Sequence, residues 1–114
     1  MTRYNKGDVI LVPFPFSDQT ATKKRPAIIV SSDTYNSISQ DIVIMAITGQ
    51  IRGHIGVGEL LIEDWQSAGL LKPSAVKSAI STIEQRLVVK ILGRLSSKDL
   101  STLEKALKEL FDLK

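Results

Sequence analysis

The chain has 114 residues, a formal net charge of +3 and a pI near 9.3, with no cysteine and a single histidine. This length fits one domain over residues 1–114, whose 43% hydrophobic and 5% aromatic residues predict an aliphatic core. The missing cysteines exclude disulfides, thiolate catalysis and thiolate-bound zinc, and the single histidine excludes a multi-histidine metal site.

No segment is typical of a targeting signal or a membrane span. Residues 1–9 lack the apolar core of a signal peptide, and no run approaches the ~20 apolar residues that a bilayer span needs. We therefore expect a cytoplasmic protein without membrane contact. The basic excess favours an acidic or polyanionic partner, such as a nucleic acid or an acidic peptide.

Two apolar runs near the N-terminus flank a polar loop. The runs, 9–14 and 27–30, are rich in Val and Ile and too short for helices, so they predict strands. Lys23, Lys24 and Arg25 end the loop between them. A solvated basic turn would explain this triplet. A phosphate site would explain it too, because a guanidinium grips two phosphate oxygens and an ammonium group supplies charge.

The next apolar run predicts a buried strand that ends in a hydroxyl. Residues 31–41 are dense in Ser, Asp and Asn, which predicts a surface loop. Residues 41–48 are almost continuously apolar, as is typical of a central strand covered on both faces. Thr48 at its exit is either an ordinary β-branched strand residue or a firmly held hydroxyl that faces a cleft.

The segments that follow predict a loop, a strand and a turn. Residues 50–58 hold three glycines in nine positions, which indicates a flexible connection with His54 as an exposed loop residue. Residues 58–62 predict a strand, and 63–70 predict one or two turns of helix. We expect Trp65 to cover the edge of the core, with stacking on a nucleobase as the alternative.

The C-terminal part predicts more strands and a closing helix. Residues 74–82 indicate a strand, whereas 87–93 fit either a short strand or a turn of helix. Leucines recur at helical spacing over 96–113, behind a capping pair formed by Ser96 and Asp99. About five strands with one closing helix predict a mainly β, α+β fold, either a small antiparallel barrel or a strongly bent sheet.

The familiar catalytic motifs are missing from the sequence. It contains no HExxH, Walker loop, GxSxG or GxGxxG, and the adjacent Glu63 and Asp64 would diverge on a strand or a helix. Arg25 with its lysines and the Thr48 hydroxyl remain as parts that hold a phosphate. A ribonuclease needs little more, because RNA supplies its own 2′-OH as nucleophile and such donors stabilise the pentacoordinate transition state.

Several segments together resemble the MazF/PemK family of toxin endoribonucleases from type II toxin–antitoxin pairs. They are GDVILVPFPFSD at 7–18, KKRPAIIVS at 23–31, the strand ending AIT at 46–48, and the helix after LGRLS at 92–96. Each motif alone is weak, but their order and spacing span nearly the whole chain.

The family resemblance implies a fold, an activity and two partners. The fold would be an SH3-like barrel of the MazF/CcdB type with a short middle helix and a C-terminal helix. A homodimer would cleave single-stranded RNA at short sequences, without a metal or cofactor, to 2′,3′-cyclic phosphate and 5′-OH ends. An acidic, partly disordered antitoxin would silence it by occupying the RNA groove, with carboxylates near Lys23, Lys24 and Arg25.

By position, the resemblance assigns the family's catalytic arginine and threonine to Arg25 and Thr48. We expect Arg25 to stabilise transition-state charge, because a guanidinium holds its proton tightly, with proton donation to the leaving 5′-oxygen as the alternative. Thr48 would orient or neutralise the phosphate. The RNA-binding candidates are Phe16, Ser17, Asp18, Lys23, Lys24, Pro26, Ser31, Gln50, Arg52 and Ser81.

The sequence departs from the family pattern in two places. Gly49 stands where serine or alanine is more usual, and Ser78 and Ala79 stand where relatives often carry larger polar groups. Two other functions stay open: a CcdB-like toxin that binds DNA gyrase through its C-terminal helix, and a noncatalytic RNA-binding module. The basic segment and the AIT strand end argue against the gyrase-binding toxin. Only a test of RNA cleavage distinguishes a ribonuclease from the noncatalytic RNA-binding module.

Overall fold

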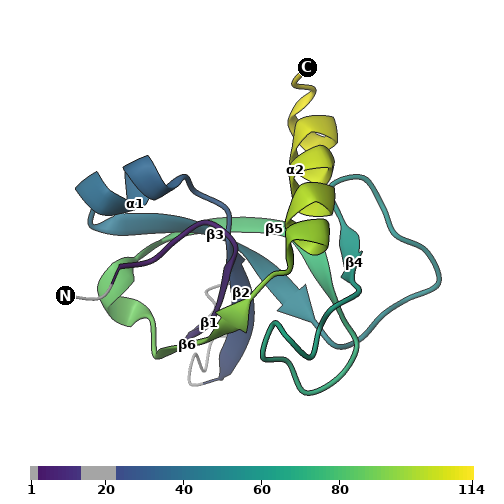
Figure 1. Ribbon diagram of the computed structural model, residues 1–114, viewed down its shortest axis with the longest axis horizontal. Helices are drawn as coiled ribbons and strands as arrows, with labels where there is room; N and C mark the ends of the chain where they lie inside the picture. The colour runs from purple at the N-terminus through teal and green to yellow at the C-terminus, as the bar shows by residue number, and fades with distance from the viewer. Residues whose placement is uncertain (1–2, 14–22) are drawn as a thin grey trace.

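A single curved, antiparallel sheet organises the computed structural model, which describes residues 3–13 and 23–114 (Figure 1). Its strand order is β4-β5-β3-β2-β1-β6. The elements are β1 (Asp8–Pro13), β2 (Lys24–Ile29), α1 (Asp33–Ile38), β3 (Asp41–Thr48), β4 (Leu60–Ile62), β5 (Ser74–Glu84), the 3₁₀ helix η1 (Gln85–Leu87), β6 (Lys90–Arg94) and α2 (Ser97–Phe111). The curled, mainly β sheet with helices confirms the predicted fold class.

Both faces of the central strands are buried, which explains their continuous apolar sequence. Successive side chains of a strand point to opposite faces, so Ile44 and Met45 enter different core clusters. The cluster beneath α2 comprises Val9, Ile28, Met45, Ile47, Leu60, Ile62, Ala68, Leu70, Val76, Leu95 and Leu103. The cluster on the other face comprises Ile10, Val12, Ala27, Ile29, Ile42, Ile44 and Ile83.

The C-terminal helix α2 is capped and anchored as its sequence predicts. Its first turn is closed by the Asp99 amide, which donates to the Ser96 hydroxyl at 3.2 Å. The Asp99 carboxylate, only 1% exposed, accepts from the amides of Glu63 and Asp64 at 3.1 and 2.8 Å. Leu103 is fully buried, while the C-terminal half of α2 extends beyond the sheet (Figure 1). No helix in the described ranges is long and apolar enough to cross a bilayer.

The predicted loop at 31–41 was wrong, because this segment contains helix α1. Ser32 caps the helix by accepting from the Tyr35 amide at 3.0 Å, and Asn36 is buried. A helix of six residues is too short to show an apolar period, and its Ser- and Asn-rich sequence is equally typical of a loop.

Of the two alternatives for residues 87–93, the short strand is confirmed, as β6 (Lys90–Arg94), whereas the segment at 63–70 differs in part from expectation. Residues 63–69 form successive turns in place of a helix, and Trp65 packs half-buried against the core as predicted. The turns end at Gly69, where φ is +80° and an added Cβ would lie 2.0 Å from the Leu92 carbonyl oxygen. This glycine therefore lets the backbone pack directly on β6.

Candidate active site

The ladder between β2 and β3 ends early, and Pro26 accounts for its end. Pairing runs from Ile29↔Ile44 to Ala27↔Ala46. The Val30 amide donates to the Val43 carbonyl at 2.9 Å, and amides of alternate residues point the same way. The nitrogen of Pro26 therefore faces β3, where it has no hydrogen to donate. The first residues of β2 consequently pair with β1 alone.

Arg25 and Thr48 are level with each other at this open end. Continuing the β2–β3 register by two residues places them opposite one another, and side-chain alternation puts both on the sheet face of Ala27 and Ala46. Arg25 is exposed and is held by pairing with Val12 of β1, so it belongs to a strand and not to the loop that the sequence predicted. A guanidinium on a strand is better fixed than one on a loop.

Thr48 is held from the other side by β5. It pairs with Ala75, and its Oγ1 accepts a hydrogen bond from the Gln50 amide at 3.1 Å. A hydroxyl that accepts from the backbone keeps its own proton for donation to a ligand. The half-buried Thr48 thus offers a positioned O–H at the end of the central strand.

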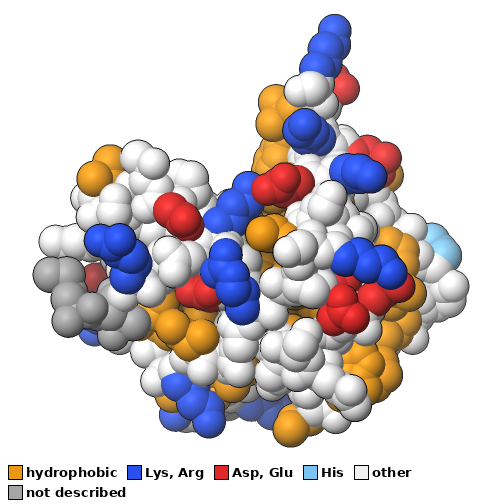
Figure 2. Space-filling model, in the orientation of Figure 1, with side chains coloured by type: hydrophobic (Ala, Val, Ile, Leu, Met, Phe, Trp, Pro, Cys, Tyr) orange, Lys and Arg blue, Asp and Glu red, His pale blue; other side chains and the backbone are white. Residues whose placement is uncertain are grey.

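A cleft of about 920 Å³ opens at this end of the strands, and both residues are part of its lining. Its charged lining consists of Arg25, Lys72 and Lys90, with no Asp or Glu among the described lining residues. Figure 2 shows Lys and Arg side chains at the lower edge of the molecule. The cleft therefore suits an anion with some apolar surface. Its other lining residues are Leu11, Pro26, Ile47, Thr48, Gly49, Gln50, Gly69, Leu70, Leu71, Ser74, Ile91 and Leu92.

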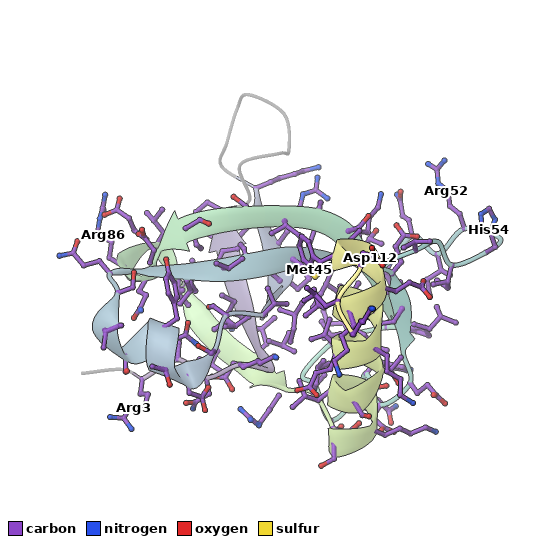
Figure 3. All side chains as sticks on the ribbon, turned by 90° about the horizontal axis from the view of Figure 1, so that it is seen from above. Arg3, Met45, Arg52, His54, Arg86 and Asp112 are labelled. Atoms are coloured by element: carbon purple, nitrogen blue, oxygen red, sulfur yellow. The ribbon has the colours of Figure 1, made fainter. Side chains whose placement is uncertain are left out.

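A smaller cavity of about 170 Å³ adjoins the cleft and shares Thr48 and Gln50 with it. Its lining also includes Arg52 and His54 from the loop between β3 and β4. Figure 3 shows these two side chains at the far end of that loop, pointing away from the sheet. His54 is exposed, as the sequence predicted. The shared residues make this cavity a continuation of the cleft toward the loop.

The other RNA-binding candidates lie in several places. Lys23 just before β2 and Lys24 at its first position are exposed and are not part of the cleft lining. Ser31 is buried at the other end of β2, where its hydroxyl donates to Asn36 and accepts from the Val43 amide. Ser81 is half-buried within β5, opposite Ile44. Phe16, Ser17 and Asp18 lie outside the described residues.

Two of the three cations in the cleft were not recognised from the sequence. Lys72 comes from the turn before β5 and Lys90 from the start of β6. Neither stands in a motif, so their local sequence gave no signal. Their meeting with Arg25 follows from the strand order β2-β1-β6 and from the packing of Gly69 against β6.

The ion pairs in the described part of the chain lie outside the cleft. Arg94 contacts Asp8 at 2.8 Å, and the Asp8 carboxylate also accepts from the Asn5 amide at 2.9 Å. Lys98 contacts Glu63 at 3.1 Å, a hydrogen bond that raises the pKa of Lys98. None of the ion pairs between described residues includes a cation of the cleft.

The curved antiparallel sheet with its C-terminal helix defines a class of small, mainly β proteins. The family comparison identifies this class. The chain belongs to the PemK-like, MazF-like toxins of type II toxin–antitoxin systems, whose sequence pattern matches residues 5–111. A search of curated protein sequences found no significant match.

Solved structures of MazF toxins share the fold. Toxin MazF-mt6 of Mycobacterium tuberculosis superposes with a TM-score of 0.75 at 21% identity, over 94% of this chain and 98% of that one. A chain of a MazE–MazF complex from Deinococcus radiodurans gives 0.77 at 15% identity, over 99% and 100%. A mycobacterial endoribonuclease in complex with its cognate antitoxin gives 0.76 at 17%, over 100% and 98%.

Proposed function

We propose that this toxin is a metal-independent endoribonuclease that cuts single-stranded RNA in the cytoplasm. The observation that supports this most is the level placement of Arg25 and Thr48 in a cleft with three cations and no carboxylate among its described lining residues. Such a site attracts the RNA backbone and provides donors for a phosphate. Family membership supports the same activity.

The reaction uses the RNA as its own nucleophile. The 2′-oxygen attacks the adjacent phosphorus and loses its proton, while the bond from phosphorus to the 5′-oxygen breaks and that oxygen gains a proton. The products are a 2′,3′-cyclic phosphate and a 5′-OH. Negative charge gathers on the nonbridging oxygens in the transition state, so donors aimed at these oxygens accelerate the step.

Arg25 and Thr48 divide this work. The Arg25 guanidinium stabilises the developing charge with its fork of donors, and the Thr48 hydroxyl orients the phosphate from the neighbouring strand. Both are held by paired strands, which keeps their separation fixed during the reaction. Losing one such donor typically costs ~3–4 kcal/mol of transition-state stabilisation.

The antitoxin is an acidic, partly disordered protein that enters the same cleft of a toxin homodimer. Support comes from the cation-lined cleft and from fold relatives in complex with an antitoxin. The double variant Lys24→Glu, Arg25→Glu reverses two charges beside the cleft, so we expect weaker antitoxin binding in a calorimetric titration. Unchanged affinity would contradict this placement of the antitoxin.

The decisive experiment incubates purified protein with mixed-sequence RNA in EDTA and maps the cleavage ends. We expect cuts at a short motif that leave a 2′,3′-cyclic phosphate and a 5′-OH. Arg25→Ala should abolish them. Arg86→Ala is the matched control, because Arg86 pairs with Glu84 at 3.2 Å and lies at the molecule's end opposite Arg52 (Figure 3).

A second arm tests the nucleophile. An RNA with 2′-deoxyribose at the mapped site should resist cleavage there, because the attacking oxygen is absent. Cleavage of that RNA would contradict the transesterification mechanism. RNA left intact by folded wild-type protein would instead favour the noncatalytic or gyrase-binding alternative.

A further inference from the structure

We propose that Lys72 is an additional phosphate-binding residue of the cleft and that Gly49 provides the space that positions it. The inference rests on the proposed function and names a specific RNA contact within that site. Lys72 would bind a backbone phosphate next to the one held by Arg25 and Thr48. Gly49 would then have a role in substrate binding without touching the substrate.

The Lys72 side chain lies directly on the backbone of Gly49. A Cβ added at Gly49 would lie 2.1 Å from Lys72 Cε, 3.3 Å from its Cδ and 3.0 Å from its Nζ. Real Cβ atoms do not approach another carbon to 2.1 Å, so only glycine allows this path. Gly49 follows Thr48 in the chain, and thus the ammonium group lies beside the strand end that carries the hydroxyl.

The backbone of Lys72 is fixed before its side chain enters the cleft. Pro73 follows it and restricts it to extended conformations. The Ser74 hydroxyl donates to the Lys72 carbonyl at 2.9 Å, and Gly69 packs the preceding turn on β6. A long side chain that starts at a fixed point and follows a fixed surface is partly ordered before ligand arrives.

The Lys72 ammonium has no carboxylate contact among the described residues. Lys72 is exposed and lines the cleft together with Arg25 and Lys90. An ammonium group held beside other cations gains most from an anion that neutralises several of them. An RNA backbone offers such a series of charges, since every nucleotide carries one phosphate.

The salt dependence of RNA binding tests this contact. The probe is the single-stranded RNA containing the mapped cleavage motif, with 2′-deoxyribose at the scissile position so that it binds without being cut. Each phosphate contact to a single strand contributes about 0.7 to the slope of log affinity against log salt. We expect Lys72→Ala to lower the slope by about 0.7 and the affinity roughly tenfold.

Gly49→Ala tests the positioning. The new Cβ meets only the flexible end of Lys72, so the fold should persist while the ammonium moves away. We expect the same loss of slope and affinity as for Lys72→Ala. The double variant should bind no worse than Lys72→Ala alone, because Gly49 acts only through that lysine. Lys72→Arg should keep the slope.

Lys105→Ala is the matched control, since Lys105 is exposed on α2 and outside the cleft lining. Circular dichroism checks that every variant is folded. The inference is wrong if wild-type protein cleaves RNA and Lys72→Ala keeps the wild-type slope, or if the losses of the two single variants add. Wild-type protein that neither cuts nor binds RNA would overturn the proposed function together with this inference.

Discussion

The cleft and the side of the molecule around α2 use their cations in different ways. Around α2, Lys98 contacts Glu63 at 3.1 Å and Lys6 contacts Glu104 at 3.6 Å, so these two positive charges have a local partner. In the cleft, Arg25, Lys72 and Lys90 have no acidic neighbour among the described lining residues. Paired surface charges are largely neutral to stability and binding, whereas cations without counter-ions create a field that extends into solvent.

This difference shows that a modest net charge can conceal a strongly polarised surface. The whole chain carries only +3, a charge that fits a nucleic acid, an acidic peptide or no anionic partner. The excess positive charge matters because part of it is gathered at the open end of β2 and β3. Substitutions in the cleft should therefore reduce RNA cleavage or binding and leave stability nearly unchanged. Substitutions around α2 should reduce stability and leave RNA cleavage nearly unchanged.

After Arg25→Ala, the largest effect on cleavage is expected for Thr48→Val. This change keeps the β-branched shape on β3 and removes the hydroxyl that we propose orients the phosphate. Single-turnover RNA cleavage should slow by roughly 10²–10³-fold with little loss of stability. Thr82→Val is the control, because Thr82 is exposed on β5 opposite Val43. Equal cleavage rates for the two variants would contradict a catalytic role of Thr48.

A large effect on stability, and not on cleavage, is expected for Asp99→Ala. The substitution removes the buried carboxylate that accepts from the Glu63 and Asp64 amides, so it should cost about 3 kcal/mol of unfolding free energy. Urea denaturation measures this loss. Glu109→Ala, an exposed change on α2, should be close to neutral. At temperatures where Asp99→Ala is folded, its RNA cleavage should match that of wild type.

An intermediate effect is expected from reversing one charge in each region. Lys90→Glu places a carboxylate in the cleft and should weaken binding of the noncleavable RNA at least tenfold at low salt. Lys105→Glu changes the net charge equally on α2 and should alter binding far less. If affinity follows net charge alone, both variants would bind the RNA equally weakly. That result would contradict the proposal that cations in the cleft contribute more to RNA binding than cations around α2.

The smallest effect concerns Lys98. Its hydrogen bond to Glu63 raises its pKa, so the contribution to stability is present below the ordinary lysine pKa and disappears as pH rises through the raised value. Lys98→Gln should therefore be slightly less stable than wild type near neutral pH. Thermal melts should show that difference vanish at strongly alkaline pH. A gap that widens at alkaline pH would contradict this assignment.

The sequence predicted the strands better than their surroundings, for physical reasons. Burial on both faces made residues 41–48 apolar throughout, and β3 follows that run. The six residues of α1 gave no period and were taken for a loop. Lys24 and Arg25 were expected in a loop because charged residues are rare inside strands, yet β1 pairs with both of them.

The candidate site was predictable only in part. The basic triplet and the strand ending in Thr48 were visible as local patterns, and the family resemblance joined them. Lys72 and Lys90 could not be found this way, because they are distant from Arg25 in the sequence and line one cleft only through the strand order and the packing of Gly69 on β6. Gly49 was noted as a departure from the family pattern, but the position of Lys72 was needed to give it a role.

The proline at the end of the β2–β3 ladder has a wider consequence. Pro26 ends the pairing of β2 with β3 because its nitrogen carries no hydrogen to donate. Neither pH nor salt can change this end of the ladder. Substituting the side chains around it would not supply the missing donor. The point where the two strands separate is thus fixed in the backbone, whereas the groups displayed there belong to side chains.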